Sequence, residues 1–146
     1  MDAPLMAKEV CLSIPSTPGM ELAATAQAEA LGEAMRLSRD KIDEVKFALV
    51  EACINAFEHA GQSAGHVDLR FRVSRRPGGS EMLEVTVADR GKGFDPARVE
   101  PPELERKLGG GGNKRGWGLK FIQSLMDEVE IRSTANGTTI VMRKYK

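Results

Sequence analysis

The stretch spanning residues 41–60, KIDEVKFALVEACINAFEHA, constrains the fold more than any other part of the chain. Successive residues of an α-helix turn by about 100°, so Glu51, Asn55 and His59 fall within an arc of about 80°. The opposite side is apolar, and we expect it to form a core face that consists of Ile42, Val45, Leu49, Ala52, Cys53 and Ala56.

The flank of this helix beyond the polar line is apolar as well, because it carries Phe47, Val50 and Ile54. A helix that is apolar nearly all round is expected to be largely buried. A carboxylate in such surroundings is costly unless it is paired, binds a metal or takes part in chemistry. The polar line therefore predicts a satisfied core network, a metal site or an acid–base site.

Composition limits the class of protein. The 146 residues suit one domain, 1–146, and 21 Lys plus Arg balance 21 Asp plus Glu, which argues against a dedicated nucleic-acid binder. No apolar run reaches the roughly 18 residues of a membrane span, and the N-terminus has no hydrophobic signal core. Cys11 and Cys53 are isolated, as expected of reduced thiols in a cytoplasmic protein.

The remaining periodicity predicts an α+β fold. We expect strands at 8–14, 66–75, 81–88, 127–133 and 138–145, and helices at 20–37, 41–60 and 117–126. Ser38 and Asp40 should cap the second helix. This order predicts two layers, with helices on one face of a mixed, mostly antiparallel sheet. The first helix should face the core with Leu22, Ala26, Ala30, Ala34 and Leu37.

Residues 97–115 are rich in proline, charge and glycine, and so long a loop is usually functional, often a lid. A passive insertion is the alternative. Just before this loop, Asp89-x-Gly91-x-Gly93 places a carboxylate at a strand end, where glycines allow a flat ligand to approach closely. The carboxylate could accept a hydrogen bond from an exocyclic amine, although a plain turn explains the motif equally well.

A second glycine-rich segment, Gly116-Trp117-Gly118-Leu119, opens the third helix directly after Lys114 and Arg115. Backbone N–H groups at a helix N-terminus bind phosphate. The segment is not a P-loop, because Lys114 is not followed by Ser or Thr, and the neighbouring hairpins exclude a dinucleotide-binding βαβ unit. Trp117 is also explained by packing at the start of the helix.

Glu51 and Asn55 supply what phosphoryl transfer requires. A carboxylate can take a proton from a nucleophile, and an amide oxygen can bind Mg²⁺. His59 is explained more simply as a hydrogen-bonded residue at the helix end.

The motifs in their order, E-x-x-x-N-x-x-x-H, D-x-G-x-G, a glycine-rich loop, G-x-G-L and N-G-T-T, resemble those of the GHKL ATPase superfamily. The segments LVEACINAFEHA, VADRGKGFDP, GWGLKFIQSLMDEVEI and NGTTIVMRKY are most similar to the small anti-sigma-factor serine/threonine kinases of bacteria. The resemblance covers nearly the whole chain and implies the Bergerat ATP-binding fold.

The resemblance also implies residue roles. Glu51 matches the general base, Asn55 the Mg²⁺ ligand and Asp89 the residue that recognises adenine. Glycines and threonines match the walls of the nucleotide pocket, namely Gly91, Gly93, Gly116, Gly118, Thr138 and Thr139. Residues 97–115 match the ATP lid, in which the γ-phosphate contact stays open among Arg98, Arg106, Lys107, Lys114 and Arg115.

The implied function is an ATP- and Mg²⁺-dependent serine/threonine kinase that acts as an anti-sigma factor. It would phosphorylate a small antagonist protein, sequester a sigma factor and form a homodimer in the cytoplasm, without membrane or direct nucleic-acid contact. Two alternatives remain open: a nucleotide-binding interaction module without significant catalysis, and a detached ATP domain of a histidine kinase.

Overall fold

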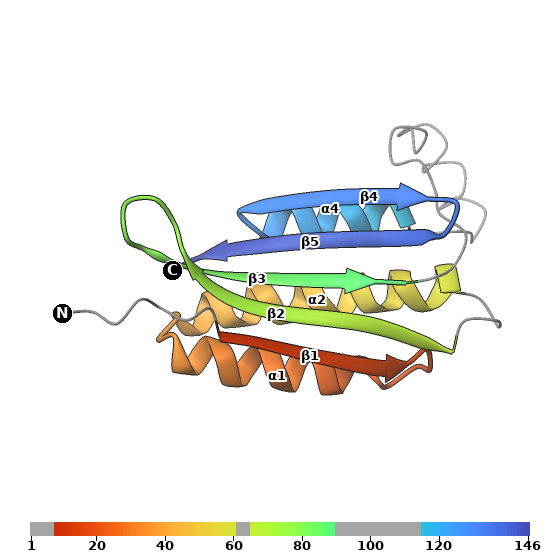
Figure 1. Ribbon diagram of the computed structural model, residues 1–146, viewed down its shortest axis with the longest axis horizontal. Helices are drawn as coiled ribbons and strands as arrows, with labels where there is room; N and C mark the ends of the chain where they lie inside the picture. The colour runs from red at the N-terminus through yellow and green to blue at the C-terminus, as the bar shows by residue number, and fades with distance from the viewer. Residues whose placement is uncertain (1–7, 61–64, 90–114) are drawn as a thin grey trace.

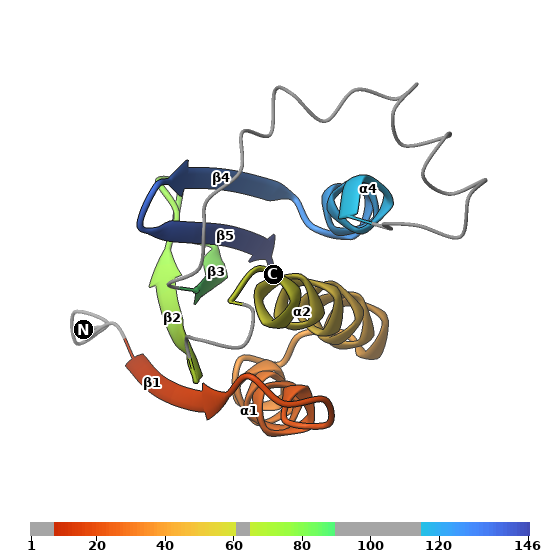
Figure 2. The ribbon, with the colours of Figure 1, turned by 90° about the vertical axis from the view of Figure 1, so that its right-hand side faces the viewer.

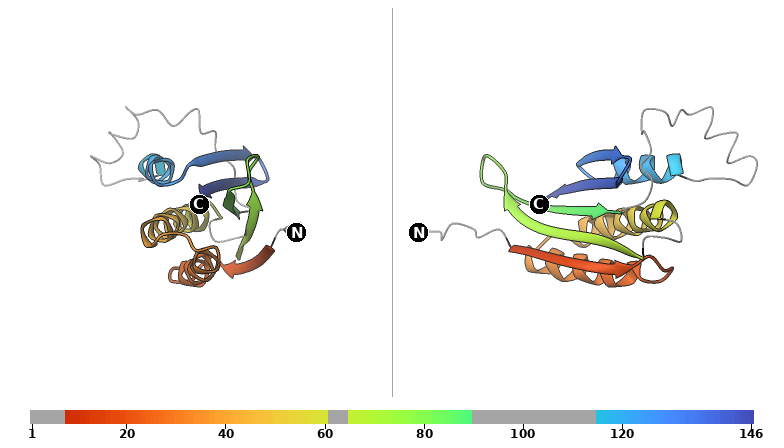
Figure 3. Two further views of the ribbon diagram at one scale, coloured as in Figure 1. Left: turned by 90° about the vertical axis from the view of Figure 1, so that its left-hand side faces the viewer. Right: turned by 45° about the vertical axis from the view of Figure 1, so that its right-hand side comes forward.

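A computed structural model describes residues 8–60, 65–89 and 115–146 as two layers, with helices on one face of a sheet (Figure 1). The elements in chain order are β1 (Lys8–Pro15), α1 (Glu21–Ala34), α2 (Arg39–Ala60), β2 (His66–Arg75), β3 (Glu81–Ala88), α4 (Arg115–Leu125), β4 (Glu128–Thr134) and β5 (Gly137–Tyr145). Viewed along the strands, α2 lies between α1 and α4 (Figure 2). No helix of the described residues covers the other face of the sheet (Figure 3).

The strand order is β1-β2-β3-β5-β4, and each of the four pairings is antiparallel. The predicted α+β class and two-layer arrangement are therefore confirmed. The expected mixed sheet is wrong for the described strands, which contain no parallel pair. The connection through α4 leads from β3 to the edge position of β4, and the tight hairpin then places β5 antiparallel to both β3 and β4.

The boundaries of the elements follow local capping. The backbone N–H of Lys41 donates to Ser38 Oγ at 3.2 Å, so Ser38 caps α2 as predicted, although the helix begins at Arg39. The first helix ends at Ala34 rather than at residue 37, and Arg36 then adopts a left-handed φ of 61°. The β2–β3 turn contains Gly78 and Gly79, whose φ values of 102° and 98° favour glycine.

The predicted inner face of α1 is wrong within the helix, whereas Leu37, just beyond its end, is buried as predicted. Leu22 is 67% exposed, and the buried residues are instead Ala24, Thr25, Ala28, Leu31 and Gly32. Alanines lie on both the buried and the exposed side of this helix, for example Ala24 and Ala26, so the apolar pattern gives little contrast between its faces. Leu31, and Met35 just beyond the helix, pack into the core. Their packing determines which face of α1 is buried.

The core face of α2 is confirmed, because Ile42, Val45, Leu49, Ala52, Cys53 and Ala56 are all buried. The expectation that the helix is buried nearly all round is wrong. Phe47 is 60% exposed and Ile54 is 38% exposed, on the side that points away from the sheet. The sheet covers only one side of α2 and its neighbours flank it, so its outer side remains in solvent (Figure 2).

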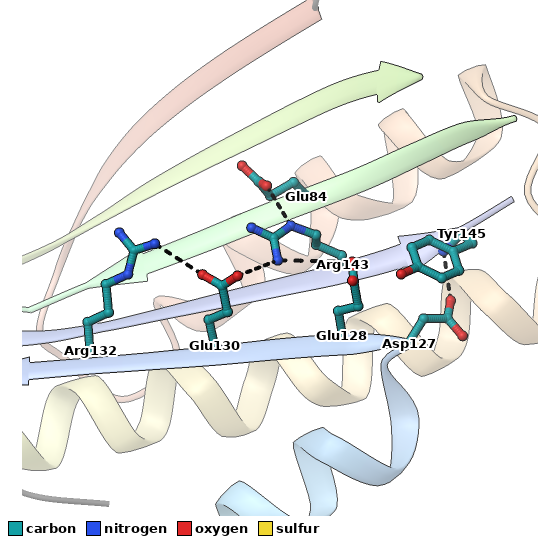
Figure 4. A network of polar contacts seen from close by, with 7 residues as sticks. All are labelled: Glu84, Asp127, Glu128, Glu130, Arg132, Arg143 and Tyr145. Carbon is teal, nitrogen blue, oxygen red and sulfur yellow. Dashed lines mark hydrogen bonds and ion pairs between the residues drawn. The ribbon is translucent and has the colours of Figure 1, made fainter. Parts of the chain in front are cut away.

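The open face of the sheet carries an ion-pair network centred on Arg143 of β5 (Figure 4). Its guanidinium contacts Glu84 on β3 at 2.8 Å and Glu130 on β4 at 2.9 Å. Glu130 also contacts Arg132 at 3.1 Å. The hydrogen bond from Arg143 is the main cause that lowers the pKa of Glu130. The network links three strands on the face that no described helix covers.

The packing of α1 against α2 depends on Gly32. A Cβ at this position would lie 2.7 Å from Cγ1 of Ile42, which is buried. Gly32→Ala is therefore expected to lower the free energy of unfolding by about 1–3 kcal/mol despite the better helix propensity of alanine. Urea unfolding measures the difference.

Gly118→Ala is the matched control, since its Cβ would meet only the flexible end of Glu51 at 3.3 Å. Equal destabilisation by both changes would contradict close packing at Gly32.

Cys53 makes stability depend on alkaline pH. Burial is the main cause that raises the pKa of its thiol from 9.0 to about 12. The folded chain thus keeps the thiol protonated where the unfolded chain ionises it, so this contribution is complete below pH 9.0 and is lost as the pH rises toward about 12. Across this pH window, the free energy of unfolding measured in urea should fall more steeply for the wild type than for Cys53→Ala. The difference in slope should be about 1.4 kcal/mol per pH unit.

Cys11→Ala is the control, because Cys11 is exposed. It should keep the wild-type slope, and the same slope in Cys53→Ala would contradict the assignment.

Candidate functional site

Four elements meet at one end of the two layers: the C-terminal ends of α2 and β3, the start of β5 and the first turn of α4 (Figure 1). The register places Ala88 opposite Thr139. Gly118 of α4 lies beside Glu51 of α2. Segments far apart in the sequence thus bring their candidate residues to the same end of the fold.

Asp89 follows the last residue of β3 and is buried. Its backbone N–H donates to the carbonyl of Thr138 at 2.9 Å, and the N–H of Thr138 donates to Asp89 Oδ1 at 3.3 Å. The hydroxyl of Thr138 lies 3.1 Å from that of Ser133. Two reciprocal hydrogen bonds therefore hold the Asp89 carboxylate at the junction of β3 and β5.

Asn55 lies one turn after Glu51 on α2 and is only 5% exposed. Its side-chain Nδ2 is buried and has no hydrogen-bond partner among the described residues. Burying an amide without a partner costs about 1–3 kcal/mol, and such groups in native proteins usually mark a ligand or a water. The unpaired amide makes Asn55 a candidate for ligand binding.

Glu51 points toward the first turn of α4. A Cβ added to Gly118 would lie 3.3 Å from Glu51 Oε2, so the carboxylate approaches the α4 backbone closely. Exposed N–H groups at the start of a helix bind phosphate, and a carboxylate beside them is suitably placed to take a proton from a group that attacks the phosphate.

Lys144 holds the other end of α4 and was not among the residues predicted from the sequence. Lys144 of β5 is buried, donates to the carbonyl of Leu125 and forms an ion pair with Glu44 of α2 at 3.2 Å. A cation at the C-terminus of a helix is favourable. Lys144 alternates with Val141 and Arg143 along β5 and so faces the helices, and this inward position of a lysine is the signal that could have identified it.

The structure does not bring every candidate to this site. Thr139 pairs with Ala88 and lies on the open face of the sheet, opposite to Thr138. Leu119 is buried in the core. By contrast, the backbone of Arg115, Gly116 and Trp117 is at the site, because these residues form the first turn of α4. Gly91, Gly93, Lys114 and most of the expected lid lie outside the described residues, as does the side chain of His59.

The described residues fit ATP with Mg²⁺. No group of three or more His, Cys, Asp or Glu residues suited to a metal occurs in the described part of the chain. Mg²⁺ is usually held by one or two protein oxygens together with substrate phosphates, so Asn55 suffices if the nucleotide provides the rest. The side-chain oxygen of Asn55 is the atom that could bind Mg²⁺, and its unpaired Nδ2 could donate to an acceptor of the bound nucleotide.

A comparison with protein families agrees with this geometry. The model of the histidine kinase-like ATPase domain matches residues 14–144, which span the chain from the end of β1 to the end of β5. The chain belongs to this family. Family membership confirms the predicted resemblance to the GHKL ATPases, and the matched range includes Asn55 and Asp89.

Two curated serine-protein kinases are similar to most of the chain. The serine-protein kinase RsbW of Bacillus velezensis is 36% identical over 120 residues, which cover 76% of this chain and 69% of that protein. The serine-protein kinase RsbW of Bacillus subtilis is 35% identical over the same coverage. The relationship to RsbW-type kinases, the closest resemblance expected from the sequence, is therefore confirmed.

A solved structure confirms the fold. The RsbU and RsbW domains of a Mycobacterium tuberculosis protein match with a TM-score of 0.64 at 18% identity, over 94% of this chain and 32% of that one. In the described part of this chain, no helix has the length and apolarity needed to cross a membrane.

Proposed function

We propose that the chain is an ATP-dependent serine/threonine protein kinase that transfers the γ-phosphate to a hydroxyl of another protein. The observation that carries the proposal is the junction of Glu51, Asn55 and the start of α4, where a carboxylate, an unpaired buried amide and helix N–H groups lie together. The similarity to RsbW serine-protein kinases supports the same reaction.

The proposed mechanism assigns one task to each residue. Asp89 accepts a hydrogen bond from the adenine amine and so orients ATP. The N–H groups at the start of α4 bind the phosphates, and Asn55 would hold Mg²⁺, which would neutralise phosphate charge. Glu51 takes the proton of the attacking serine hydroxyl, whose oxygen forms the new P–O bond while the bond to ADP breaks.

The proposed partners are proteins. The acceptor is a small antagonist protein supplied in trans. The regulated target is a sigma factor that the kinase sequesters. The kinase acts in the cytoplasm as a homodimer. The RsbW relatives are serine-protein kinases, which supports a protein as the acceptor. Thr139 is not needed for this proposal, since its side chain lies on the other face of the sheet.

The test is incubation with Mg²⁺, ATP labelled at the γ-phosphate and the small proteins encoded beside the gene. We expect label on serine or threonine of one of these proteins. ATP binding without transfer to any of them would overturn the kinase and favour the alternative, a nucleotide-binding interaction module. Label on a histidine would instead favour the detached domain of a histidine kinase.

A further inference from the structure

The large apolar side chains exposed in the described part of the chain are Leu22, Phe47, Ile54 and Phe121. Phe47 and Ile54 lie seven residues apart on α2 and therefore share the side that points away from the sheet. Phe121 is 43% exposed on the neighbouring helix α4. These side chains belong neither to the core nor to the proposed nucleotide site. Apolar side chains gathered in solvent usually mark an interaction surface.

Two contacts show how α2 and α4 align. Gly118 lies beside Glu51, and Lys144 joins the carbonyl of Leu125 to Glu44. The helices run in opposite directions (Figure 1). The two contacts are seven residues apart on each helix, so the residue numbers rise along α4 as they fall along α2. Phe121, three residues after Gly118, therefore lies level with residue 48, next to Phe47. We call the exposed surface formed by Phe47, Ile54 and Phe121 the α2–α4 outer face.

The secondary structure of this surface restricts what can bind there. Backbone N–H and C=O groups within a helix are bonded internally, so the α2–α4 outer face offers none to an extended segment. A strand laid across it would leave its own backbone groups unpaired. A partner helix satisfies its backbone internally and can present an apolar stripe to a surface of this kind.

The charges beside the apolar residues restrict the partner further. Asp40 and Glu51 both fall within about 40° of Phe47 around α2. The nearby cation Lys46 is already engaged by Glu29 of α1 at 2.8 Å. The apolar stripe therefore runs along a line of carboxylates, which favours a partner of positive charge.

We infer that the α2–α4 outer face is a docking surface for an amphipathic, positively charged helix of a partner protein. Bound there, the partner helix lies beside Glu51, so docking brings the partner to the proposed phosphoryl-transfer site. The inference goes beyond the proposed function, because the surface can dock such a helix whether or not the chain transfers phosphate.

The test uses the full chain and two labelled peptides of about 14 residues, roughly four helical turns. Both have leucines at positions i, i+3, i+7 and i+10; one carries lysines on its polar face and its twin carries glutamates. Fluorescence anisotropy should show at least about tenfold tighter binding of the lysine peptide. Phe47→Ala and Phe121→Ala together should weaken that binding by about tenfold or more.

Leu22→Ala is the matched control, because Leu22 is equally apolar and exposed but lies on α1. It should change the affinity by less than about twofold. Equal binding of the two peptides, no binding, or an equal loss in Leu22→Ala would overturn the inference. Each replaced side chain is exposed, so thermal unfolding should confirm that all variants fold.

A second copy of the chain is the competing occupant, and sedimentation velocity distinguishes it. A wild-type dimer that becomes a monomer in Phe47→Ala/Phe121→Ala would show that the α2–α4 outer face joins two copies, which overturns the inference. An oligomeric state unchanged by the two substitutions leaves the surface available to the partner helix, as the inference requires.

Discussion

Glu51→Gln is expected to slow phosphoryl transfer to a serine hydroxyl by about 10²- to 10⁴-fold, the usual contribution of a general base. Glutamine has nearly the same shape as glutamate but cannot accept the proton at neutral pH. Glu51 lies beside Gly118 and makes no described hydrogen bond that the fold requires, so the affinity for ATP should stay within about threefold of the wild type. Single-turnover transfer rates and calorimetric ATP affinities measure the two effects separately.

Glu44→Gln is the matched control for Glu51. Glu44 lies two turns earlier on the same side of α2, where it pairs with Lys144 at the far end of α4. Its replacement should lower stability slightly and leave the transfer rate within about twofold. If Glu51→Gln transfers phosphate as fast as Glu44→Gln, Glu51 is not the base.

Asp89→Asn is expected to weaken ATP binding by about 10- to 100-fold, the effect of losing one buried charge-assisted hydrogen bond. The asparagine carbonyl can still accept from the N–H of Thr138, so the β3–β5 junction should persist. Its amide group, however, would present a donor where the adenine amine requires an acceptor. Calorimetric titration with ATP measures the change, and urea unfolding verifies the fold.

Asp127→Asn is the matched control for Asp89. The Asp127 carboxylate also accepts a hydrogen bond from a backbone N–H, that of Tyr145 at 2.7 Å, but at the opposite end of β5 (Figure 4). It should leave the ATP affinity unchanged within about twofold. Unaltered affinity in Asp89→Asn would mean that Asp89 does not recognise adenine.

The periodicity of the sequence predicted the helices and strands and much of the core, because polar and apolar residues alternate clearly in most of these elements. The alternation in β2 and β3 and the core face of α2 were predicted correctly, since each has polar residues opposite apolar ones. The inner face of α1 was not, because alanines lie on both its buried and its exposed side. The exposure of Phe47 and Ile54 depends on which neighbours cover α2, and local sequence does not contain that information.

The candidate site was predicted only in part, because local spacing determines the position of some of its residues and strand pairing determines that of others. Glu51 and Asn55 lie on one helix, so their spacing alone places them together. The reciprocal hydrogen bonds between Asp89 and Thr138 depend on the pairing of β3 with β5, across the whole of α4 and β4. The same pairing turns Thr139 to the open face, and only the register determines which of the two adjacent threonines faces the helices.

The central claim is that this end of the fold transfers phosphate from ATP to a protein hydroxyl. A single-turnover measurement tests it most directly: the chain loaded with Mg²⁺ and γ-labelled ATP is mixed with excess acceptor protein, and the label is followed over time. We predict one phosphoserine or phosphothreonine for each ADP formed, with no matching release of inorganic phosphate. Label that stays in ATP, or appears as free phosphate while the acceptor remains unmodified, would contradict the claim.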